Sequence, residues 1–379
     1  MDQSTLAQPA AAVGASGAPP LRYAIVGTGM MGQEHILNIG LLPGARVSAI
    51  CEPDPAMRAR AATLAPQMRI TSSLDELLAE DDFDALAIVS PNHLHVEQLY
   101  SIAARRSVPI LVEKPVFTDP ADLARLKAFA ASYQELVWVA MEYRYMPPIA
   151  AFLSQVHEVT GGIRMLSIRE HRFPFLEKVG DWNRFNANTG GTLVEKCCHF
   201  FDLMRLAIGA EPVRVMASAG QAVNHLTERY DDRTPDIWDH GYIIVDFDGG
   251  ARAMLDLCMF AEGGSYQEEV TAVGPTGKIE AFVPGPTRFW PEHLGAPPVA
   301  KVLVSPREPR GPREVTIPVD QDLLEVGDHN GATYYQHQLF LQAVRDGRPP
   351  AVSLDDGIAA VRMGIAAQES ALTGEAVRL

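Results

Sequence analysis

The run GGTLVEKCCHFFD, at residues 190–202, brings a carboxylate, a lysine, two cysteines and a histidine close together in the chain. If the run is helical, Glu195, Cys198, His199 and Asp202 share one face, because residues three, four and seven apart align on a helix. A carboxylate and an imidazole one turn apart are suited to accepting, donating or orienting a proton. The run therefore predicts a reactive helix face. Other side chains of this helix are expected in the core: Cys197, Phe201 and Met204.

Zinc binding is one alternative for the same run, since thiol, imidazole and carboxylate groups are its usual ligands. One helix rarely supplies more than two ligands to one metal, and the run has no HxxxH or HExxH spacing. We therefore predict no metal site. A structural alternative makes His199 a core histidine with Glu195 as its partner. Asp202 is expected to be structural and to fix the imidazole tautomer.

A glycine motif, GTGMMG, follows the apolar stretch 21–26 and opens a helical pattern. In this context such glycines let the backbone approach a pyrophosphate, which the N–H groups and dipole of the helix favour. A tight turn without a ligand is the disfavoured alternative. The motif residues predicted to hold a dinucleotide are Gly27, Gly29, Met30, Met31 and Gly32.

Glu52 ends the second predicted strand, where a carboxylate accepts hydrogen bonds from the adenosine ribose hydroxyls. The same carboxylate would repel a 2′-phosphate, so NAD is favoured over NADP. Arg58 or Arg60 could soften that preference.

Two further segments, SPNHLH at 90–95 and EKP at 113–115, follow the predicted strands 85–89 and 109–112. Ligands of open α/β sheets bind outside the carboxyl ends of the strands, so both loops should border the cofactor. Beside a cationic nicotinamide ring the ammonium of Lys114 is disfavoured, which would lower its pKa. The alternative is a solvated loop lysine paired with Glu113. The cofactor contacts predicted here are Ser90, Pro91, Asn92, His95, Glu113 and Lys114.

These motifs need a scaffold, and residues 21–141 predict a doubly wound parallel sheet, because strand and helix patterns alternate. The strand patterns are 21–26, 46–51, 85–89, 109–112 and 136–141, and helix patterns lie near 55–65, 74–80, 93–105 and 119–132. Residues 1–20 lack Lys and Arg and are rich in Ala, Gly, Pro and Ser, which predicts a disordered tail rather than a secretory signal.

Residues 142–379 predict a second, α+β domain with a large, open and mostly antiparallel sheet. Strand patterns at 242–247 and 251–260 flank a DGG turn, and those at 270–273 and 278–282 flank PTG. A helix at 149–159, a strand at 164–171 and a helix ending near 208 precede them. Residues 284–316, rich in Pro, Gly and Arg, predict a long surface excursion. Helices near 333–346 and 355–372 close the chain and pack back, the last beginning at a capping box at Ser353.

The composition of the chain argues against several classes of function. The chain has 379 residues and a formal net charge of −15, without the Lys/Arg cluster that nucleic-acid binding needs. No apolar run approaches the roughly 18 residues of a membrane span. The four cysteines lack CxxC or disulfide-framework spacing, which favours a reduced, cytoplasmic chain.

Taken together, GTGMMG, the carboxylate of CEPD, SPNHLH, EKP and YRYMP at 143–147 resemble the glucose–fructose oxidoreductase/inositol dehydrogenase/MocA-like (Gfo/Idh/MocA) family. The C-terminal segment from HQLFLQAVRDGRPP onwards is similar to that family's last pair of helices. The resemblance implies a Rossmann domain followed by an α/β domain whose open sheet often forms a homodimer or homotetramer. It also implies NAD(P)-dependent oxidation or reduction of CH–OH groups in sugars, inositols and related polyols.

The family's active site pairs the EKP lysine with an acidic residue and a histidine four positions later, after a Gly-Gly turn. By resemblance these are Lys114, Glu195 (where aspartate is commoner) and His199. The chain departs from the family at Lys196, usually apolar, and at Cys197, usually small. We predict that His199 accepts the proton of a substrate hydroxyl while Lys114 stabilises the developing alkoxide.

A pool of polar and aromatic residues favours a neutral, hydroxyl-rich substrate. The predicted substrate contacts are Lys114, Tyr143, Arg144, His171, Trp182, Asn183, Glu195, Lys196 and His199, with Arg169, Asp181, Asp239 and His240 in the wider pool.

The sequence leaves three functions open. The first is an NAD-dependent dehydrogenase of a sugar, glycoside or cyclitol. The second keeps NAD bound and uses transient ketone formation to cleave a glycoside. The third is a non-catalytic NAD-binding sensor or co-repressor, against which the presence of both Lys114 and His199 argues.

Overall fold

A computed structural model of the protein describes residues 18–379. The predicted tail at residues 1–20 therefore lies almost wholly outside the described residues. Within residues 18–379 no helix has the combination of length and apolar character that crossing a membrane requires.

The first sheet is parallel throughout and has the strand order β3-β2-β1-β4-β5-β6. Every residue of β4 and β5 is buried, as expected for strands covered on both faces. Its strands are β1 (Leu21–Val26), β2 (Ala45–Cys51), β3 (Arg69–Thr71), β4 (Ala85–Ile88), β5 (Ile110–Val112) and β6 (Val137–Val139). The helices between them are α1 (Met30–Leu41), α2 (Pro55–Leu64), α3 (Leu74–Ala79), η2 (Asn92–Leu94), α4 (His95–Ala103), η3 (Pro120–Asp122) and α5 (Leu123–Ser132).

The second sheet has nine strands in the order β14-β13-β12-β11-β7-β10-β9-β8-β15, with β7 and β10 its one parallel pair among the described residues. The chain is thus α/β, with a doubly wound parallel sheet and a larger, mostly antiparallel one, as predicted. The strands are β7 (Met165–His171), β8 (Pro212–Gly220), β9 (His240–Phe247), β10 (Arg252–Cys258), β11 (Glu268–Val273), β12 (Gly277–Val283), β13 (Lys301–Pro306), β14 (Arg313–Thr316) and β15 (Val377–Arg378).

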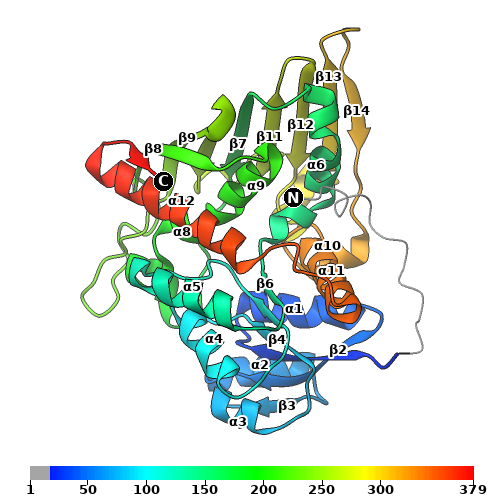
Figure 1. Cartoon of the computed structure of the whole chain (residues 1–379), viewed down its shortest axis with the longest axis vertical. Helices are drawn as coiled ribbons and strands as arrows, with labels where there is room; N and C mark the ends of the chain where they lie inside the picture. Colours follow the sequence, from blue (N-terminus) through cyan, green and yellow to red (C-terminus); the bar gives the residue numbers. More distant parts are fainter. Residues whose placement is uncertain (1–17) are drawn as a thin grey trace.

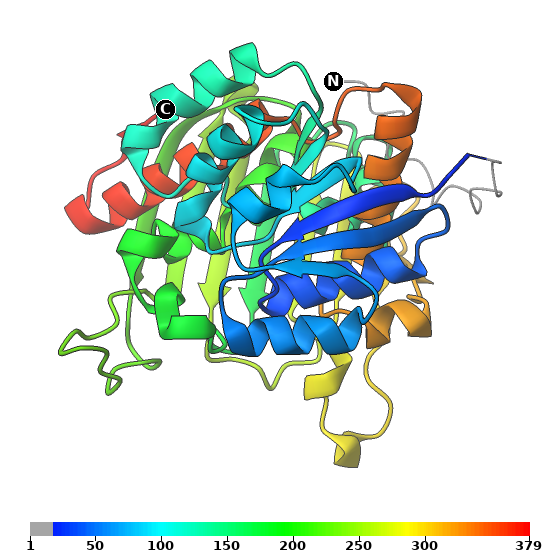
Figure 2. The ribbon, with the colours of Figure 1, turned by 90° about the horizontal axis from the view of Figure 1, so that it is seen from below.

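Helices cover one face of the second sheet. In Figure 1, α6, α9 and α12 lie in front of its strands, and the parallel sheet lies below. Turning the molecule by 90° brings β1, β2 and their helices to the front, with α11 beside them (Figure 2). The remaining helices are η4 (Glu142–Tyr145), α6 (Pro147–Thr160), η5 (Val179–Arg184), α7 (Asn186–Thr189), α8 (Thr192–Glu195), α9 (Cys198–Ile208), η6 (Asp248–Gly250), η7 (Thr287–Phe289), η8 (Glu292–Leu294), α10 (Gln321–Glu325), α11 (Ala332–Asp346) and α12 (Leu354–Thr373).

Several elements differ from the sequence-based expectation. Residues 284–316 are not only a surface excursion, because β13 and β14 extend the second sheet beyond β12. The strands β3, β8 and β15 were not predicted; β3 and β15 are very short, and β8 lacks a regular alternation of buried and exposed residues. By contrast, the predicted capping box at Ser353 is present, with Asp356 as its reciprocal partner.

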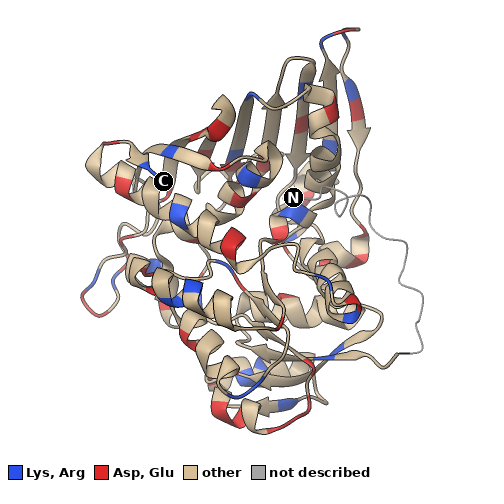
Figure 3. Ribbon diagram, in the orientation of Figure 1, with Lys and Arg blue, Asp and Glu red and all other residues tan. Residues whose placement is uncertain are grey.

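The opposite face of the second sheet is open within the described chain. Along β9 every second residue is buried, so Tyr242 and Ile244 point to the other side, where Tyr242 is 60% exposed. Met254 pairs with Ile244 across β10 and is also exposed. Charges of both signs are interspersed over the molecule (Figure 3).

Candidate active site

The glycine turn between β1 and α1 is tightly packed at two of its glycines and open at the third. A Cβ on Gly27, whose φ is +96°, would lie 2.7 Å from the carbonyl oxygen of Val89, and one on Gly32 would lie 2.2 Å from that of Gly27. A Cβ on Gly29 would meet no atom within 4 Å. Close approach of the strand, turn and helix explains two glycines, and the space beside Gly29 fits the approach of a ligand.

The N-terminus of α1 fits the pyrophosphate of a dinucleotide. Gly29 caps the helix without a side-chain hydrogen bond, and the first turn, with Met30 and Met31, has no acidic residue. The first N–H groups of α1 are therefore left without an acidic side chain that would compete with an anion. Glu52, buried at the end of β2, accepts hydrogen bonds from the N–H and hydroxyl of Thr28 in the same turn (2.6 and 3.0 Å).

The loops after β4 and β5 are joined through a buried histidine. His95 Nδ1 lies 2.8 Å from the Pro115 carbonyl oxygen, and Nε2 lies 3.0 Å from that of Ser90. Ser90 Oγ donates to Gln98, and Pro91 caps η2. The Asn92 amide nitrogen is buried without a partner among the described residues. Of these residues, Asn92 thus has a donor available for a ligand, whereas His95 holds the two loops together.

The Glu113 side chain is held in place by a histidine of α1 rather than by the Lys114 side chain. Its carboxylate lies 3.0 Å from His35, whose other ring nitrogen lies 2.7 Å from His337 of α11. The Lys114 ammonium points away and donates to the Glu195 carbonyl oxygen at 3.1 Å. The EKP loop therefore meets the Gly-Gly turn region through Lys114.

The electrostatics of Lys114 reflect this neighbourhood. Burial disfavours its ammonium, but Cys198, Glu195 and Glu113 together raise the pKa of Lys114 above its usual value. This direction is opposite to the one expected beside a cationic nicotinamide ring. Without such a ring, Lys114 is a positively charged donor.

Glu195 and His199 lie on adjacent helical segments, because hydrogen bonding is interrupted between α8 and α9. Both side chains are buried. Glu195 Oε1 is 3.5 Å from Lys178 Nζ, while Glu195 Oε2 and His199 Nδ1 have no hydrogen-bond partner within residues 18–379. Two buried polar atoms without partners next to Lys114 are suited to a ligand that carries hydroxyl groups.

His199 stacks on Tyr143, with ring centroids 4.1 Å apart and planes within 9°. Burial, reinforced by Lys114 and Lys196, holds the pKa of His199 well below its usual value. The imidazole is therefore neutral at neutral pH and able to accept a proton.

Asp202 does not fix the tautomer of His199, contrary to expectation. Both of its carboxylate oxygens accept hydrogen bonds from Arg144, and the pair is buried between η4 and α9. Arg144 is thereby engaged in a structural ion pair, since its remaining contact is the Ala351 carbonyl oxygen. The ion pair explains why an acidic residue lies one turn beyond His199.

The other predicted substrate residues divide between two locations. Trp182 lies over Lys178 and contacts His93 of the loop after β4, and the neighbouring Asn183 is buried with an unpartnered amide oxygen. His171, by the alternation of β7, faces the open side of the sheet, where it contacts Asp256. Three members of the wider pool also have other partners: Arg169 with Glu269, Asp239 with backbone N–H groups at 222–224, and His240 with Asp239.

Two matches to family models decide the affiliation of the chain. Residues 21–141 match the NAD-binding Rossmann fold of the Gfo/Idh/MocA oxidoreductase family, and residues 155–379 match its C-terminal alpha/beta domain. The chain belongs to the Gfo/Idh/MocA oxidoreductase family. Its parallel sheet is accordingly an NAD-binding Rossmann fold, and the glycine turn, helix N-terminus and Glu52 carboxylate fit that cofactor.

Named members of the Gfo/Idh/MocA family are similar over most of the chain. The inositol 2-dehydrogenase of Leifsonia xyli subsp. xyli is 27% identical over 275 residues, which cover 72% of this chain and 76% of that protein. The rhizopine catabolism protein MocA of Rhizobium meliloti is 22% identical, and the similar region covers 92% of this chain and 94% of MocA. The structure of levoglucosan dehydrogenase with NADH and levoglucosan is similar to that of this chain, with a TM-score of 0.79 and 20% sequence identity. The similarity covers 95% of this chain and 99% of the levoglucosan dehydrogenase chain.

Several residues near the site were not predicted. Lys178 pairs with Glu195, while Glu170 and Glu268 face Lys196 from the second sheet, and His329 lies near Tyr143. A sequence signal existed for Glu170 and Glu268, because each occupies a position that strand alternation assigns to the buried face. Lys178 and His329 lie in irregular segments, so their partners depend on the tertiary fold.

Three side chains that could act as metal ligands lie close together in this chain, but their proximity alone does not make a metal site. Ligand atoms of Glu34, Glu142 and His329 lie within 4.8 Å of one another in the described chain. Burial opposes protonation of His329, but Glu142 and Glu34 raise its pKa to about 9. A protonated imidazole therefore supplies the positive charge between the two carboxylates.

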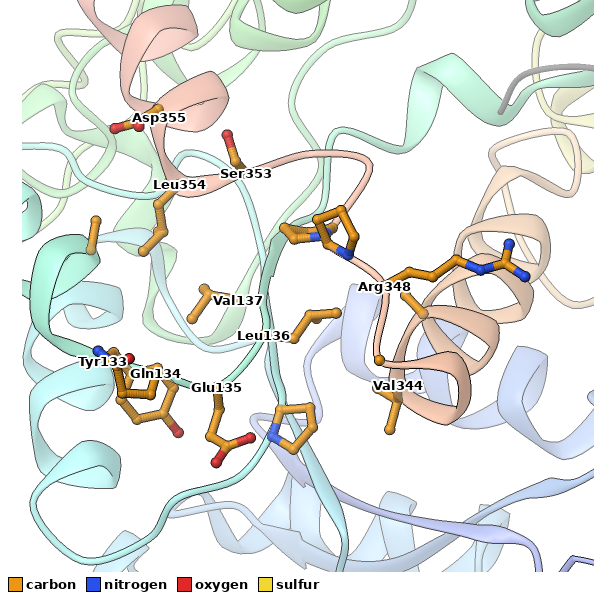
Figure 4. Close-up of a pocket in the computed structure, with 16 residues that line it drawn as sticks. Tyr133, Gln134, Glu135, Leu136, Val137, Val344, Arg348, Ser353, Leu354 and Asp355 are labelled. Carbon is orange, nitrogen blue, oxygen red and sulfur yellow. The ribbon is translucent and has the colours of Figure 1, made fainter. Parts of the chain in front are cut away.

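A cavity of about 480 Å³ lies away from this site (Figure 4). It is bounded by residues at the amino ends of β5 and β6, such as Pro109 and Leu136, and by Arg348 and Ser353 from the α11–α12 connection. None of the predicted site residues lines it. The glycine turn and Lys114 follow the carboxyl ends of their strands, where the ligands of such sheets bind.

Proposed function

We propose that the protein transfers hydride between NAD and a secondary ring hydroxyl of a sugar, glycoside or cyclitol. The observation that carries the proposal is the convergence of Lys114, Glu195 and His199 beside the carboxyl ends of the Rossmann strands. The named relatives support the substrate class, because they include an inositol dehydrogenase and a levoglucosan dehydrogenase.

In this mechanism bound NAD supplies the hydride acceptor for alcohol oxidation. The neutral His199 imidazole takes the hydroxyl proton as the C–H bond is cleaved. Lys114 donates to the same oxygen and stabilises the negative charge that develops there. In the reverse direction the imidazolium returns the proton and Lys114 polarises the carbonyl.

Glu195 would bind a neighbouring hydroxyl through its free Oε2, while Lys178 holds Oε1. A neutral polyol offers O–H donors to this carboxylate and oxygen acceptors to Lys114, so it leaves no buried charge without a partner. This complementarity supports a polyol over an apolar substrate.

The reaction is tested by incubating the purified protein with NAD and a panel of inositols and pyranosides while following NADH absorbance. We expect NADH from at least one polyol. A cleaved glycoside without free NADH would instead indicate transient ketone formation with bound NAD. Tight NAD binding without turnover across the panel would indicate the sensor.

Variants of the proposed proton-transfer pair sharpen this test. Lys114→Met and His199→Asn should each lower kcat by at least roughly 100-fold, because each removes a group acting in the transition state. NAD affinity, measured by calorimetry, should change little for His199→Asn. Near-normal turnover in either variant would contradict the assignment.

We also propose that two or four copies of the chain associate through the open face of the second sheet. Support comes from the exposed apolar side chains Tyr242, Ile244 and Met254, which lie together on that face.

A further inference from the structure

Lys196, at which the chain departs from the family pattern, is buried among groups that hold its ammonium in place. Nζ lies 2.8 Å from Glu170 Oε1 on β7 and donates to the hydroxyl of Tyr143 at 2.5 Å. The ammonium also lies 4.7 Å from the centroid of the Tyr143 ring. A single cation thus connects the second sheet, through Glu170, with η4, through Tyr143.

Tyr143 extends this connection to the proposed proton acceptor. One side of its ring stacks on His199, and its hydroxyl is held by Lys196. Because Tyr143 is itself buried, its ring has little freedom to turn away from the imidazole.

From this geometry we infer that Lys196 is a positioning residue for His199: its ammonium anchors Tyr143, and the anchored ring and nearby positive charge keep the imidazole oriented and unprotonated. The inference rests on the proposed role of His199 as proton acceptor. It assigns a role to the residue that distinguishes this chain from the family pattern.

Charged groups other than Lys196 also affect the protonation of His199. Lys114 from the EKP loop, His329 before α11 and Arg172 after β7 also disfavour the imidazolium. Glu195 is the nearest carboxylate on the preceding turn, and Asp202 on the following turn is neutralised by Arg144. Lys196 differs from the other cations because it binds the hydroxyl of the tyrosine that stacks on His199, whereas the ring of His329 lies 6.0 Å from that of Tyr143.

The counterions of Lys196 keep the group charged despite its burial. Burial lowers the pKa of Lys196 to about 8, with Arg172 acting in the same direction and Glu170 opposing it. Glu268, the cross-strand neighbour of Glu170, has its pKa raised to about 7 by burial and by Glu170. At neutral pH the cluster therefore still holds an ammonium beside Tyr143.

The inference is tested by NMR titration of ¹³C-labelled histidine side chains in the protein without NAD or substrate. The His199 signal is identified by its loss in His199→Asn. In Lys196→Met the imidazole should protonate roughly tenfold more readily than in the wild type, because the cation that binds the hydroxyl of the stacked tyrosine is lost. Lys196→Arg keeps the charge and should restore the wild-type titration.

A second variant controls for misfolding, because Lys196→Met leaves the buried Glu170 with Arg172, 3.7 Å away, as its one remaining cation among the described residues. The double variant Lys196→Met/Glu170→Gln removes both charges at similar volume and should shift His199 in the same direction. Lys278→Met removes a partly exposed lysine of the same sheet and should leave the titration unchanged.

An unchanged His199 titration in folded Lys196→Met and in the double variant would overturn the inference, as would an equal shift in Lys278→Met. These titrations need no substrate, so they are independent of the polyol panel. A shifted titration without turnover on any polyol would retain the Lys196–His199 coupling and reject the dehydrogenase function.

Discussion

Glu52 has a hydrogen-bonding role within the protein and capacity left for a ligand. Oε2 accepts from Thr28, and Oε1 accepts from the N–H of Asp54 at 2.9 Å. A carboxylate oxygen has two lone pairs, so Oε1 can accept a further hydrogen bond from a ribose hydroxyl, whereas Oε2 already accepts two from Thr28. Arg58 lies beside this position, donating to the carbonyl oxygens of Glu52 and Pro53.

Replacing this carboxylate should therefore change the cofactor preference. In Glu52→Ser the repulsion of a 2′-phosphate is lost while Arg58 remains, so we expect the NADP/NAD ratio of kcat/KM to rise roughly tenfold or more. Glu80→Ser, an exposed change on the same domain, is the control. An unchanged ratio in Glu52→Ser would refute the ribose role.

Among the elements, α11 is held to α1 and η4 by a buried ionic cluster. His329, just before α11, lies 2.9 Å from Glu34 of α1 and 3.6 Å from Glu142 of η4. The Thr333 hydroxyl, in the first turn of α11, lies 2.9 Å from Glu34 Oε1 and 2.6 Å from Glu142 Oε2. The cluster depends on a protonated His329, whose pKa is raised to about 9 chiefly by Glu142 and Glu34 against the effect of burial.

This arrangement predicts a pH-dependent contribution to stability. Because the folded-state pKa of His329 is raised, its contribution is fully present below about pH 6.5 and is lost as pH rises through about 9. Between pH 6 and pH 10 the wild type should lose roughly 3 kcal/mol more unfolding free energy than His329→Gln. Urea denaturation measures this difference.

The exposed histidine His293 provides the matched control. His293→Gln should follow the wild type over the same pH range. Parallel stability curves for His329→Gln and the wild type would contradict the cluster's role.

At the scale of the whole molecule, one face of the second sheet is covered by helices and the other is not, within the described chain. One carries α6, α9 and α12, and the other exposes Tyr242, Ile244 and Met254 within the described chain (Figure 1). An exposed apolar patch on a sheet face is commonly buried against another layer. A second copy of the same face would supply that layer.

A charge introduced into this face should therefore weaken self-association. We expect the wild type to sediment above the 41.2 kDa of one chain, and Ile244→Glu to sediment nearer to it, because association would bury an unpaired carboxylate. Leu372→Glu changes an exposed leucine of α12, away from the sheet face, and should sediment like the wild type. A wild type that sediments as a single chain would refute the association.

Apart from the short strand β3, the sequence by itself determined the order of elements in the Rossmann fold, together with the glycine turn and the residues at the ends of β2, β4 and β5. These signals are local: a buried strand is a short apolar run, and a glycine turn needs particular residues at fixed spacing. The fold class and the NAD-binding domain were predictable for that reason. The residue types of Lys114, Glu195 and His199 were also visible, although their roles remain proposals.

Only the tertiary structure decided which charged groups meet. Asp202 pairs with Arg144 from 58 residues away, and Lys196 reaches Tyr143 across 53 residues. The strands β13 and β14 likewise form because the edge of β12 is available to β13, which in turn pairs with β14. Such partners depend on how distant elements pack, so local spacing identified Lys196 as unusual without revealing that it holds the ring beside His199.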